Sequence, residues 1–194
     1  TTVRFAMQLG YAGYPEFQRA LEEMVMNRLN SVQRMQFTYG RVPQGEILET
    51  VLQSDIEKIK MTLEEVDRSA FERAADTILS AQTIYIVGIR SCAPLASFLA
   101  FYFHMIFPDV RQVQTNSSSE IFEQMIRITE DDVVIGISFP RYSKQAVSAM
   151  NFAKRKGARG IALTDSLLSP LAQQADFVLL ARSDMASVVD SLVA

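Results

Sequence analysis

From residue 83 onward, short apolar runs alternate with amphipathic stretches, and this alternation restricts the fold more than any other feature of the chain. The apolar runs predict strands at residues 83–87, 110–113, 133–138, 160–164 and 177–181. The stretches between and before them predict helices at residues 68–80, 91–107, 119–127, 144–156 and 170–174. Continuous apolar strands separated by helices are typical of parallel strands buried on both faces. The sequence therefore predicts an α/β domain with a parallel five-stranded sheet between helices.

Two of the predicted strands end in residues suited to an anion. The first strand runs into Gly88 and Ser91 at the start of a helix. The third runs into Ser138, Arg141 and Ser143 before another helix. Helix starts offer unpaired N–H groups and a positive dipole end, which favour phosphate. Because ligands of open parallel sheets bind beyond the carboxyl ends of the strands, we predict one phosphate-bearing ligand between the two turns.

The predicted ligand contacts come from these two turns and from the end of the fourth strand. They are Arg90, Ser91, Ser138, Arg141, Ser143, Thr164 and Ser166. Each has an ordinary structural alternative, because serine and threonine are common helix caps and a loop arginine is usually solvated. Residues 116–120 have two interpretations as well: they line the rim of the pocket, or they cap the helix that follows.

Groups suited to catalysis are few. His104 lies among aromatic residues within a predicted helix, where a packed histidine is commoner than a general base. Glu120 is the one carboxylate expected near the pocket. Cys92 is the single cysteine, so the sequence predicts neither a disulfide within the chain nor a cysteine metal cluster. We assign no catalytic residue, no metal ligand and no cofactor.

The amino-terminal segment differs in charge from the rest of the chain. Residues 1–41 carry five arginines and three glutamates, a net charge of +2, which leaves −5 for the remainder. A short helix is expected up to Gly10, followed by a helix over residues 15–30 that buries Phe17, Leu21, Met24 and Val25. The short helix carries polar residues of the kind that contact phosphates and base edges in DNA. They are Thr1, Thr2, Arg4 and Gln8.

A connecting helix is expected after the amino-terminal segment. Apolar residues recur at three- and four-residue steps from Ile47 to Val66, which indicates a long helix with an apolar stripe. A stripe of this length predicts packing on the body of the protein or on a second subunit. We therefore predict a small all-α domain at residues 1–41, a linker and connecting helix at 42–67, and an α/β domain at 68–194. Both chain ends read as interior to helices, so we expect further residues at each end of the natural protein, and the lone cysteine and lack of a signal peptide predict a cytoplasmic location with no membrane partner.

The amino-terminal residues resemble a known family. The pattern Thr1-Thr2-Val3-Arg4-Phe5, then Leu9-Gly10, then Gly13-Tyr14 and Phe17 is similar to the recognition helix and following turn of the RpiR family of bacterial transcription regulators. The region from about residue 68 resembles the sugar isomerase (SIS) domain that these regulators carry. The resemblance implies a flavodoxin-like sheet, a helix-turn-helix remnant, DNA as partner, a phosphorylated sugar effector, and homodimers or homotetramers formed through the SIS domains.

The resemblance also carries over to the two turns. The family's first phosphate-turn serine falls on Ser91, and its second loop reads Ser-x-Ser-Gly-x-Thr where this chain has Ser138 to Ser143. Pro140 replaces a serine, Arg141 replaces the glycine, and Ser143 replaces the threonine. Either Arg141 compensates with charge for the altered cradle, or the ligand differs from an ordinary sugar phosphate.

Three functions follow as hypotheses. The first is a transcription regulator of sugar or related carbon metabolism, not an enzyme, whose SIS domain senses a phosphorylated sugar. The second is an SIS-type aldose–ketose isomerase with Glu120 or His104 as base. The third is a non-catalytic subunit that binds a protein partner.

Overall fold

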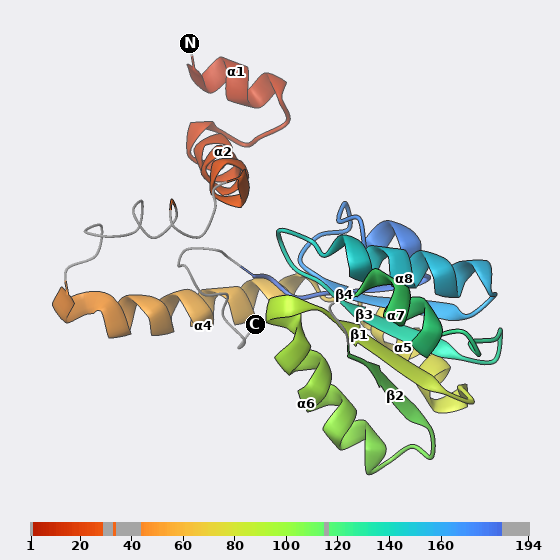
Figure 1. Ribbon diagram of the computed structural model, residues 1–194. Coiled ribbons are helices and arrows are strands. Elements are labelled where there is room, and N and C mark those ends of the chain that lie inside the picture. Colours follow the sequence, from red (N-terminus) through yellow and green to blue (C-terminus); the bar gives the residue numbers. More distant parts are fainter. Residues whose placement is uncertain (1, 29–32, 34–43, 115–116, 184–194) are drawn as a thin grey trace. The chain divides into compact units, whose positions relative to one another are not determined.

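Figure 1 shows the computed structural model of the chain, which describes residues 2–28, 33, 44–114 and 117–183. The chain divides into two compact units between Ser54 and Asp55, inside helix α4 (Ile47–Glu65). The domain limits expected at residues 41 and 67 stay a prediction. Among the described residues, no helix combines the length and the apolarity needed to cross a membrane.

The first unit contains helices α1 (Thr2–Gln8) and α2 (Tyr14–Arg28). Gly10 ends α1 as expected, because its φ of 91° lies in the left-handed region that glycine adopts without strain. The ring of Phe17 packs between the two helices, with centroid distances of 5.7 Å to Phe5 and 5.5 Å to Tyr11. The sequence pattern of a helix, a glycine turn and a second helix is therefore confirmed.

The predicted burial along α2 is wrong in part. Phe17 is half-buried, but Leu21, Met24 and Val25 are 42%, 50% and 44% exposed. In α1, Ala6 is the buried residue. Helix α1 has seven residues, and it leaves these three apolar side chains of α2 partly exposed among the described residues.

Helix α4 follows a 3-10 turn, η1 (Gln44–Glu46), and confirms the expected connecting helix. Much of its apolar stripe is exposed among the described residues: Ile47, Leu48, Val51, Leu52, Ile56, Ile59 and Leu63. The carboxyl end of α4 is tied to the segment after the last strand. The backbone N–H of Arg182 donates to Oγ1 of Thr62 at 2.8 Å, and the Arg182 guanidinium pairs with Glu65 at 2.6 Å.

The second unit is built on a sheet of five parallel strands. The strands are β1 (Ile84–Gly88), β2 (Val110–Val113), β3 (Val133–Ile137), β4 (Arg159–Thr164) and β5 (Phe177–Leu180). Their order across the sheet is β2-β1-β3-β4-β5, and every neighbouring pair is parallel. This is the flavodoxin-like order. The predicted fold class is therefore confirmed, with strand bounds within one residue of those expected.

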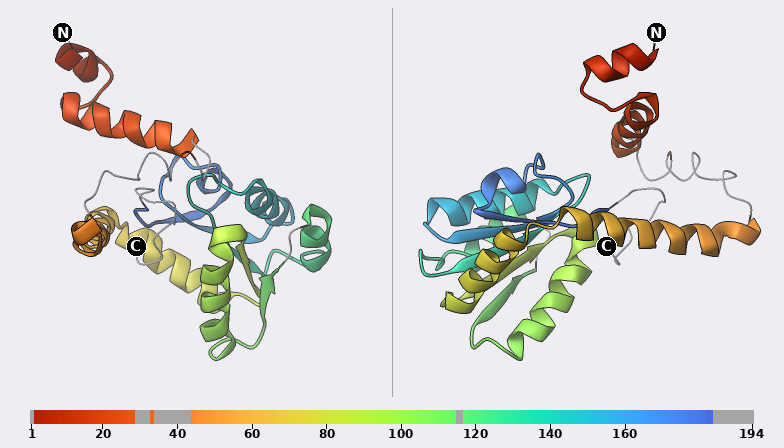
Figure 2. Two further views of the ribbon diagram at one scale, coloured as in Figure 1. Left: turned by 60° about the vertical axis from the view of Figure 1, so that its left-hand side comes forward. Right: turned by 180° about the vertical axis from the view of Figure 1, so that it is seen from behind.

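Helices cover both faces of this sheet. Figures 1 and 2 show α5 (Arg68–Ser80) and α6 (Ala93–His104) on one face, and α7 (Ser118–Gln124) and α8 (Lys144–Arg155) on the other. Small side chains let the helices approach the strands closely. The buried alanines of these helices are Ala70, Ala74, Ala96, Ala100, Ala146, Ala149 and Ala153. The sheet therefore has one core on each face, as continuous apolar strands require.

The closest approach of helix and strand lies at the end of β1. A Cβ on Gly88 would lie 2.5 Å from the carbonyl oxygen of Cys92 and 2.8 Å from Cβ of Ala96. Real Cβ atoms do not approach other atoms this closely. Gly88 is therefore required because the chain turns directly from the strand into η2 (Arg90–Cys92) and then α6.

Three expected helices differ from those observed. The helix expected over residues 91–107 begins as η2, and α6 ends at His104. The helix expected over residues 119–127 is α7, which ends at Gln124. The helix expected at 170–174 is a single 3-10 turn, η3 (Ala172–Gln174). Its N–H groups bond three residues back, as from Ala175 to Ala172, and three residues are too few to nucleate an α-helix.

A polar network lies at the amino ends of β1 and β2. The Arg111 guanidinium donates to both oxygens of Asp109, at 3.1 and 2.8 Å, and to the hydroxyl of the buried Tyr85 at 3.1 Å. These hydrogen bonds lower the pKa of Asp109 and raise that of Arg111, while burial raises the pKa of Tyr85. The shifted groups thus lie at the opposite end of the strands from the predicted ligand site.

Candidate ligand-binding site

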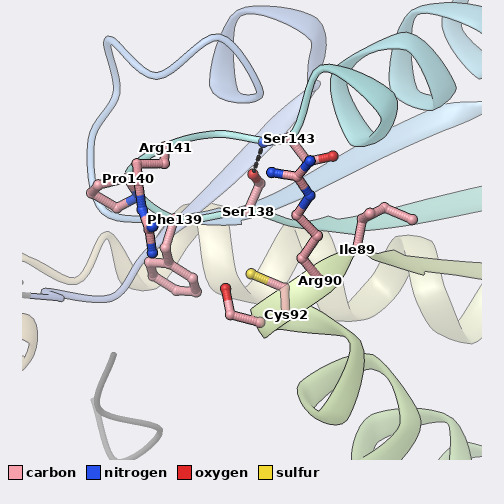
Figure 3. Close-up of a pocket in the computed structure, with 9 residues that line it drawn as sticks. Ile89, Arg90, Cys92, Ser138, Phe139, Pro140, Arg141 and Ser143 are labelled. Carbon is pink, nitrogen blue, oxygen red and sulfur yellow. Dashed lines mark hydrogen bonds between the residues drawn. The ribbon is translucent and has the colours of Figure 1, made fainter. Parts of the chain in front are cut away.

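A cavity of about 160 Å³ lies beyond the carboxyl ends of β1 and β3 (Figure 3). Two chain segments form it, one following each strand. Its lining residues are Ile89, Arg90, Ser91, Cys92, Ser138, Phe139, Pro140, Arg141 and Ser143. A single water needs roughly 10–15 Å³ by this measure, so the cavity has room for a phosphate group with part of a small organic molecule.

The topology explains why the cavity is there. β1 and β3 are adjacent, with Gly88 paired to Ile137 at their carboxyl ends. The chain leaves β1 toward β2 on one side and leaves β3 toward β4 on the other. The two connections diverge at this point, and the divergence leaves a crevice that open α/β sheets use for ligands. The structure thus brings together five of the seven predicted contacts: Arg90, Ser91, Ser138, Arg141 and Ser143.

The two serines of the second segment are held by backbone groups. Oγ of the buried Ser138 accepts a hydrogen bond from the N–H of Ser143 at 3.0 Å. Oγ of Ser143 accepts from the N–H of Ala146 at 3.3 Å and caps α8. A hydroxyl that accepts one bond still has its proton to donate. Both serines can therefore donate to an anion without giving up their structural bonds.

The two arginines of the lining adopt a strained backbone. φ is 58° at Arg90 and 69° at Arg141, and no other non-glycine residue in the described part of the chain has a positive φ. The left-handed conformation costs an L-residue with a Cβ roughly 1–2 kcal/mol. Strain of this kind is found at functional sites. Both strained residues line the same cavity.

The charge of the lining is positive. Arg90 and Arg141 supply two cations, and no lining residue is acidic. The carbonyl of Arg90 accepts a hydrogen bond from the N–H of Ala93, but its guanidinium forms no hydrogen bond or ion pair with any residue that the structure describes. No group of three His, Cys, Asp or Glu side chains within the described ranges is placed to hold a metal ion. The chemistry of the site is that of an anion receptor with hydroxyl and guanidinium donors.

Thr164 and Ser166 do not line this cavity. Thr164 is fully buried, and its hydroxyl donates to Asp165 at 3.2 Å. Oγ of Ser166 accepts from the N–H of Leu168 at 3.1 Å. Asp165 also accepts from the hydroxyl of Tyr142, at 2.9 and 3.2 Å from its two oxygens. Asp165, directly after β4, therefore holds the second segment of the cavity through its hydrogen bonds with Tyr142. Ligand contact by Thr164 and Ser166 stays a prediction.

The other residues considered from the sequence lie elsewhere. His104 is exposed at the far end of α6, about 18 Å along the helix from the cavity. Glu120 is exposed in the first turn of α7 and is not among the lining residues. Asn116 and Thr1 lie outside the described residues. In α1, Thr2, Arg4 and Gln8 are exposed, as a surface for DNA requires.

The sequence prediction missed part of the lining. Ile89 follows directly after β1, Phe139 follows Ser138 after the end of β3, and both add apolar surface to the cavity. The alternation of side chains along a strand could have predicted Ile89, because it continues past the end of β1 and places residues 87 and 89 on the same face of the sheet. No feature of the sequence predicted that the backbone of Arg90 is left-handed.

Comparisons with known proteins agree with this architecture. The profile of the SIS domain family matches residues 77–194. The SIS domain of an RpiR transcription factor from Sphaerobacter thermophilus superposes with a TM-score of 0.72 at 29% identity, over 76% of this chain and 82% of that one. The NanR protein of Vibrio vulnificus, solved in complex with ManNAc-6P, has a TM-score of 0.64 at 21% identity over 93% of this chain and 62% of its own. The similarity to NanR shows a shared fold.

Curated relatives are similar along most of the chain. HexR of Escherichia coli strain K12, an HTH-type transcriptional regulator, is 28% identical over 184 residues, which cover 90% of this chain and 59% of HexR. An uncharacterized HTH-type transcriptional regulator of Clostridium perfringens is 24% identical over 92% of this chain and 63% of its own length. The chain thus spans about three fifths of the curated relatives that it matches. The predicted resemblance is confirmed, and the chain belongs to the SIS domain family.

Proposed function

We propose that this chain is the effector-sensing part of a DNA-binding transcription regulator, and that its cavity binds a phosphorylated sugar. The observation that carries the proposal is the cavity itself. It lies at the β1/β3 switch point, combines the hydroxyls of Ser138 and Ser143 with the guanidinium groups of Arg90 and Arg141, and has no acidic lining residue. Hydroxyl and guanidinium donors around a positive cavity suit a phosphate ester.

The relatives support the regulatory half of the proposal. The named curated relatives are HTH-type regulators, and NanR was solved with a sugar phosphate. In this chain, α1 exposes Thr2, Arg4 and Gln8, which suit phosphate and base contacts in the major groove. Ligand binding in the cavity then favours one arrangement of the protein over another and so changes its affinity for DNA. Such a regulator works in the cytoplasm.

The isomerase hypothesis receives less support from the geometry. Aldose–ketose isomerisation needs a base within hydrogen-bond reach of the reacting carbon. The described lining of the cavity contains no carboxylate and no histidine. His104 lies at the far end of α6, and Glu120 lies outside the lining. The SIS fold is shared with isomerases, such as the phosphoheptose isomerase of Francisella tularensis at 18% identity, so turnover of a sugar phosphate by this protein would favour this second candidate.

Substitution of Ser138 by alanine tests the sugar-binding half. The variant loses one hydrogen bond to the phosphate, and a hydrogen bond to a charged group contributes about 1.5–3 kcal/mol, so affinity should fall about tenfold to a hundredfold. Thermal-shift screening against hexose and pentose monophosphates identifies the ligand, and calorimetry then compares the variants. Ser80→Ala, which removes an exposed hydroxyl at the end of α5, is the matched control. Equal affinity in Ser138→Ala would contradict the proposed site.

Substitution of Arg4 by alanine tests the DNA-binding half in the full-length protein. Loss of an arginine contact in the major groove is expected to weaken DNA binding about tenfold and to leave sugar phosphate affinity unchanged. The measurement is fluorescence anisotropy with duplexes from promoters of sugar-catabolic operons, with and without the ligand. Arg68→Ala, an exposed helical arginine of the sheet unit, is the control. The same DNA affinity in Arg4→Ala and the unchanged protein would reject α1 as the reading helix.

We also propose that the protein forms a homodimer or homotetramer through α6. This helix carries no Asp, Glu, Lys or Arg, and its outer face is apolar. The exposed side chains are those of Phe98, Phe101 and Tyr102 on α6 and of Met105 and Ile106 directly after it, at 66%, 64%, 49%, 73% and 69%. A helix that is apolar all round is normally buried on all sides. A second copy of the same helix suits this face because an uncharged apolar surface is complementary to itself in a two-fold interface.

A further inference from the structure

A hydrogen bond outside the lining of the cavity carries one inference beyond the proposed function. Tyr142 and Asp165 are not lining residues, but Tyr142 lies in the sequence between two residues that are, Arg141 and Ser143. The hydroxyl of Tyr142 donates to the carboxylate of Asp165, at 2.9 and 3.2 Å from its two oxygens. The contact therefore joins the segment that follows β3 to the residue directly after β4.

Asp165 is a buried and strong acceptor for this bond. It is 7% exposed, and the fully buried Thr164 also donates its hydroxyl to the carboxylate, at 3.2 Å. Among the described residues, no ion pair joins the carboxylate to a cation. A buried carboxylate needs hydrogen bonds to offset its loss of hydration, and bonds to an ionised acceptor are about twice as strong as bonds between neutral groups. The end of the sheet therefore holds Tyr142 strongly.

The segment held in this way has a strained backbone. φ at Arg141 is 69°, a left-handed value that is unfavourable for a residue with a Cβ. Such a conformation persists only where the surrounding structure enforces it. One bond next to Arg141 is that from Tyr142 to Asp165. Another is the bond from the N–H of Ser143 to Oγ of Ser138 at 3.0 Å, which brings together two hydroxyls that line the cavity.

We propose that Asp165 is a positioning residue of the ligand site, which acts through Tyr142 to keep residues 138–143 in the conformation that presents both serine hydroxyls to one ligand. The inference rests on the proposed sugar-phosphate function and adds to it a residue outside the lining. Without this contact the strained turn relaxes, and the aligned conformation is populated for only part of the time. The apparent dissociation constant is the intrinsic one divided by that population, so Asp165 contributes to affinity without touching the ligand.

Tyr142→Phe tests the inference because it removes the hydroxyl and keeps the ring. If the aligned conformation falls to about one tenth of the population, affinity falls about tenfold. Calorimetry on the full-length protein measures this loss, with inorganic phosphate, glucose 6-phosphate and ribose 5-phosphate as probes.

Two variants of Asp165 complete the test. Asp165→Ala is expected to weaken binding as much as Tyr142→Phe does, and the double variant to be no weaker than either, because both changes remove the same contact. Asp165→Asn keeps an acceptor oxygen for the Tyr142 hydroxyl and is expected to bind within about threefold of the unchanged protein.

Tyr85→Phe is the matched control for a general loss of stability. Tyr85 is fully buried, and its hydroxyl accepts a hydrogen bond from Arg111 at 3.1 Å, at the other end of the strands. This variant is expected to melt at a lower temperature than the unchanged protein, because it loses a hydrogen bond, and to bind the probes with unchanged affinity. A loss of affinity equal to that of Tyr142→Phe would show that lower stability alone produces it, and would overturn the inference.

Amide hydrogen exchange gives a second measurement that needs no ligand. The bond from the N–H of Ser143 to Ser138 protects this amide from exchange. A tenfold larger population of the relaxed segment would speed its exchange about tenfold. We expect this increase in Tyr142→Phe and in Asp165→Ala, and an unchanged rate in Tyr85→Phe. Equal rates in Tyr142→Phe and the unchanged protein would contradict the positioning role.

The affinities also distinguish the inference from the proposed function. Unchanged affinity in Tyr142→Phe, with binding that depends on Ser138, overturns the inference and leaves the sugar-phosphate function standing. A double variant in which the two losses of affinity multiply also overturns the inference, since the residues would then act separately. Absence of binding by all three probes and by the monophosphate panel overturns both.

Discussion

Replacing Gly88 with alanine is expected to lower the free energy of unfolding by about 2–3 kcal/mol, the upper part of the range for inserting atoms into a packed core. The new Cβ would lie 2.5 Å from the carbonyl oxygen of Cys92 and 2.8 Å from Cβ of Ala96. Neither neighbour can rotate away, because one is a backbone atom and the other is fixed to the helix backbone. The start of α6 must therefore move away from β1, and the cavity segment at residues 89–92 moves with it.

Urea denaturation followed by circular dichroism measures the loss. A domain of this size should show a lower midpoint with an unchanged slope. Gly45→Ala is the matched control, because a Cβ there meets no atom within 4 Å, and its midpoint should stay the same or rise slightly. We also expect Gly88→Ala to bind sugar phosphates more weakly at temperatures where it is still folded. A midpoint equal to that of the unchanged protein would mean that α6 can be displaced without loss of core packing.

Replacing Phe101 with glutamate is expected to convert the proposed oligomer to a smaller species. Phe101 is 64% exposed at the middle of the apolar face of α6, so a glutamate there is solvated in the monomer. In a two-fold interface the substitution occurs twice, and each copy buries an unpaired charge. If each charge costs about 2 kcal/mol, the dissociation constant rises about a thousandfold.

Analytical ultracentrifugation at several micromolar concentrations measures this change, and circular dichroism verifies that the variant is folded. Ile126→Glu is the matched control, since Ile126 is 65% exposed and follows α7 on the opposite face of the sheet. The control is expected to keep the assembly of the unchanged protein. A monomeric unchanged protein would contradict the proposal for α6, as would a Phe101→Glu variant that sediments like the control.

Much of the sheet was predictable because its strands are buried on both faces. Residues 84–88 and 133–137 are all buried, and full burial is what turns a strand into a continuous apolar run. The ends of the predicted strands then indicated the position of the cavity, because polar side chains were expected where each apolar run ends. Ser138 and Ser143 were found in this way.

The remaining features depend on contacts that no local pattern records. Thr164 is the last residue of β4, and Ser138 directly follows the neighbouring β3, but the hydroxyl of Thr164 is bonded to Asp165 inside the protein. Whether a polar residue at the end of a strand lines the cavity or is buried inside the protein depends on the path that the chain takes after the strand. The apolar residues of α2 look like core residues from their spacing, and the described helix α1 is too short to cover them. For Arg141, the glycine of the family pattern was the one signal of a left-handed backbone, and the structure retains that backbone at φ 69°.

The attachment of α4 at one end has a mechanical consequence. Thr62 and Glu65, in its last turn, are bonded to Arg182 directly after β5, so this end of the helix follows any displacement of the sheet edge. Within the sheet unit, α4 runs from Asp55 to Glu65, a length of about 15 Å. A tilt of about 10° at the attached end would displace Asp55 by about 3 Å. Movement at the edge of the sheet is therefore transmitted to the start of this helical segment.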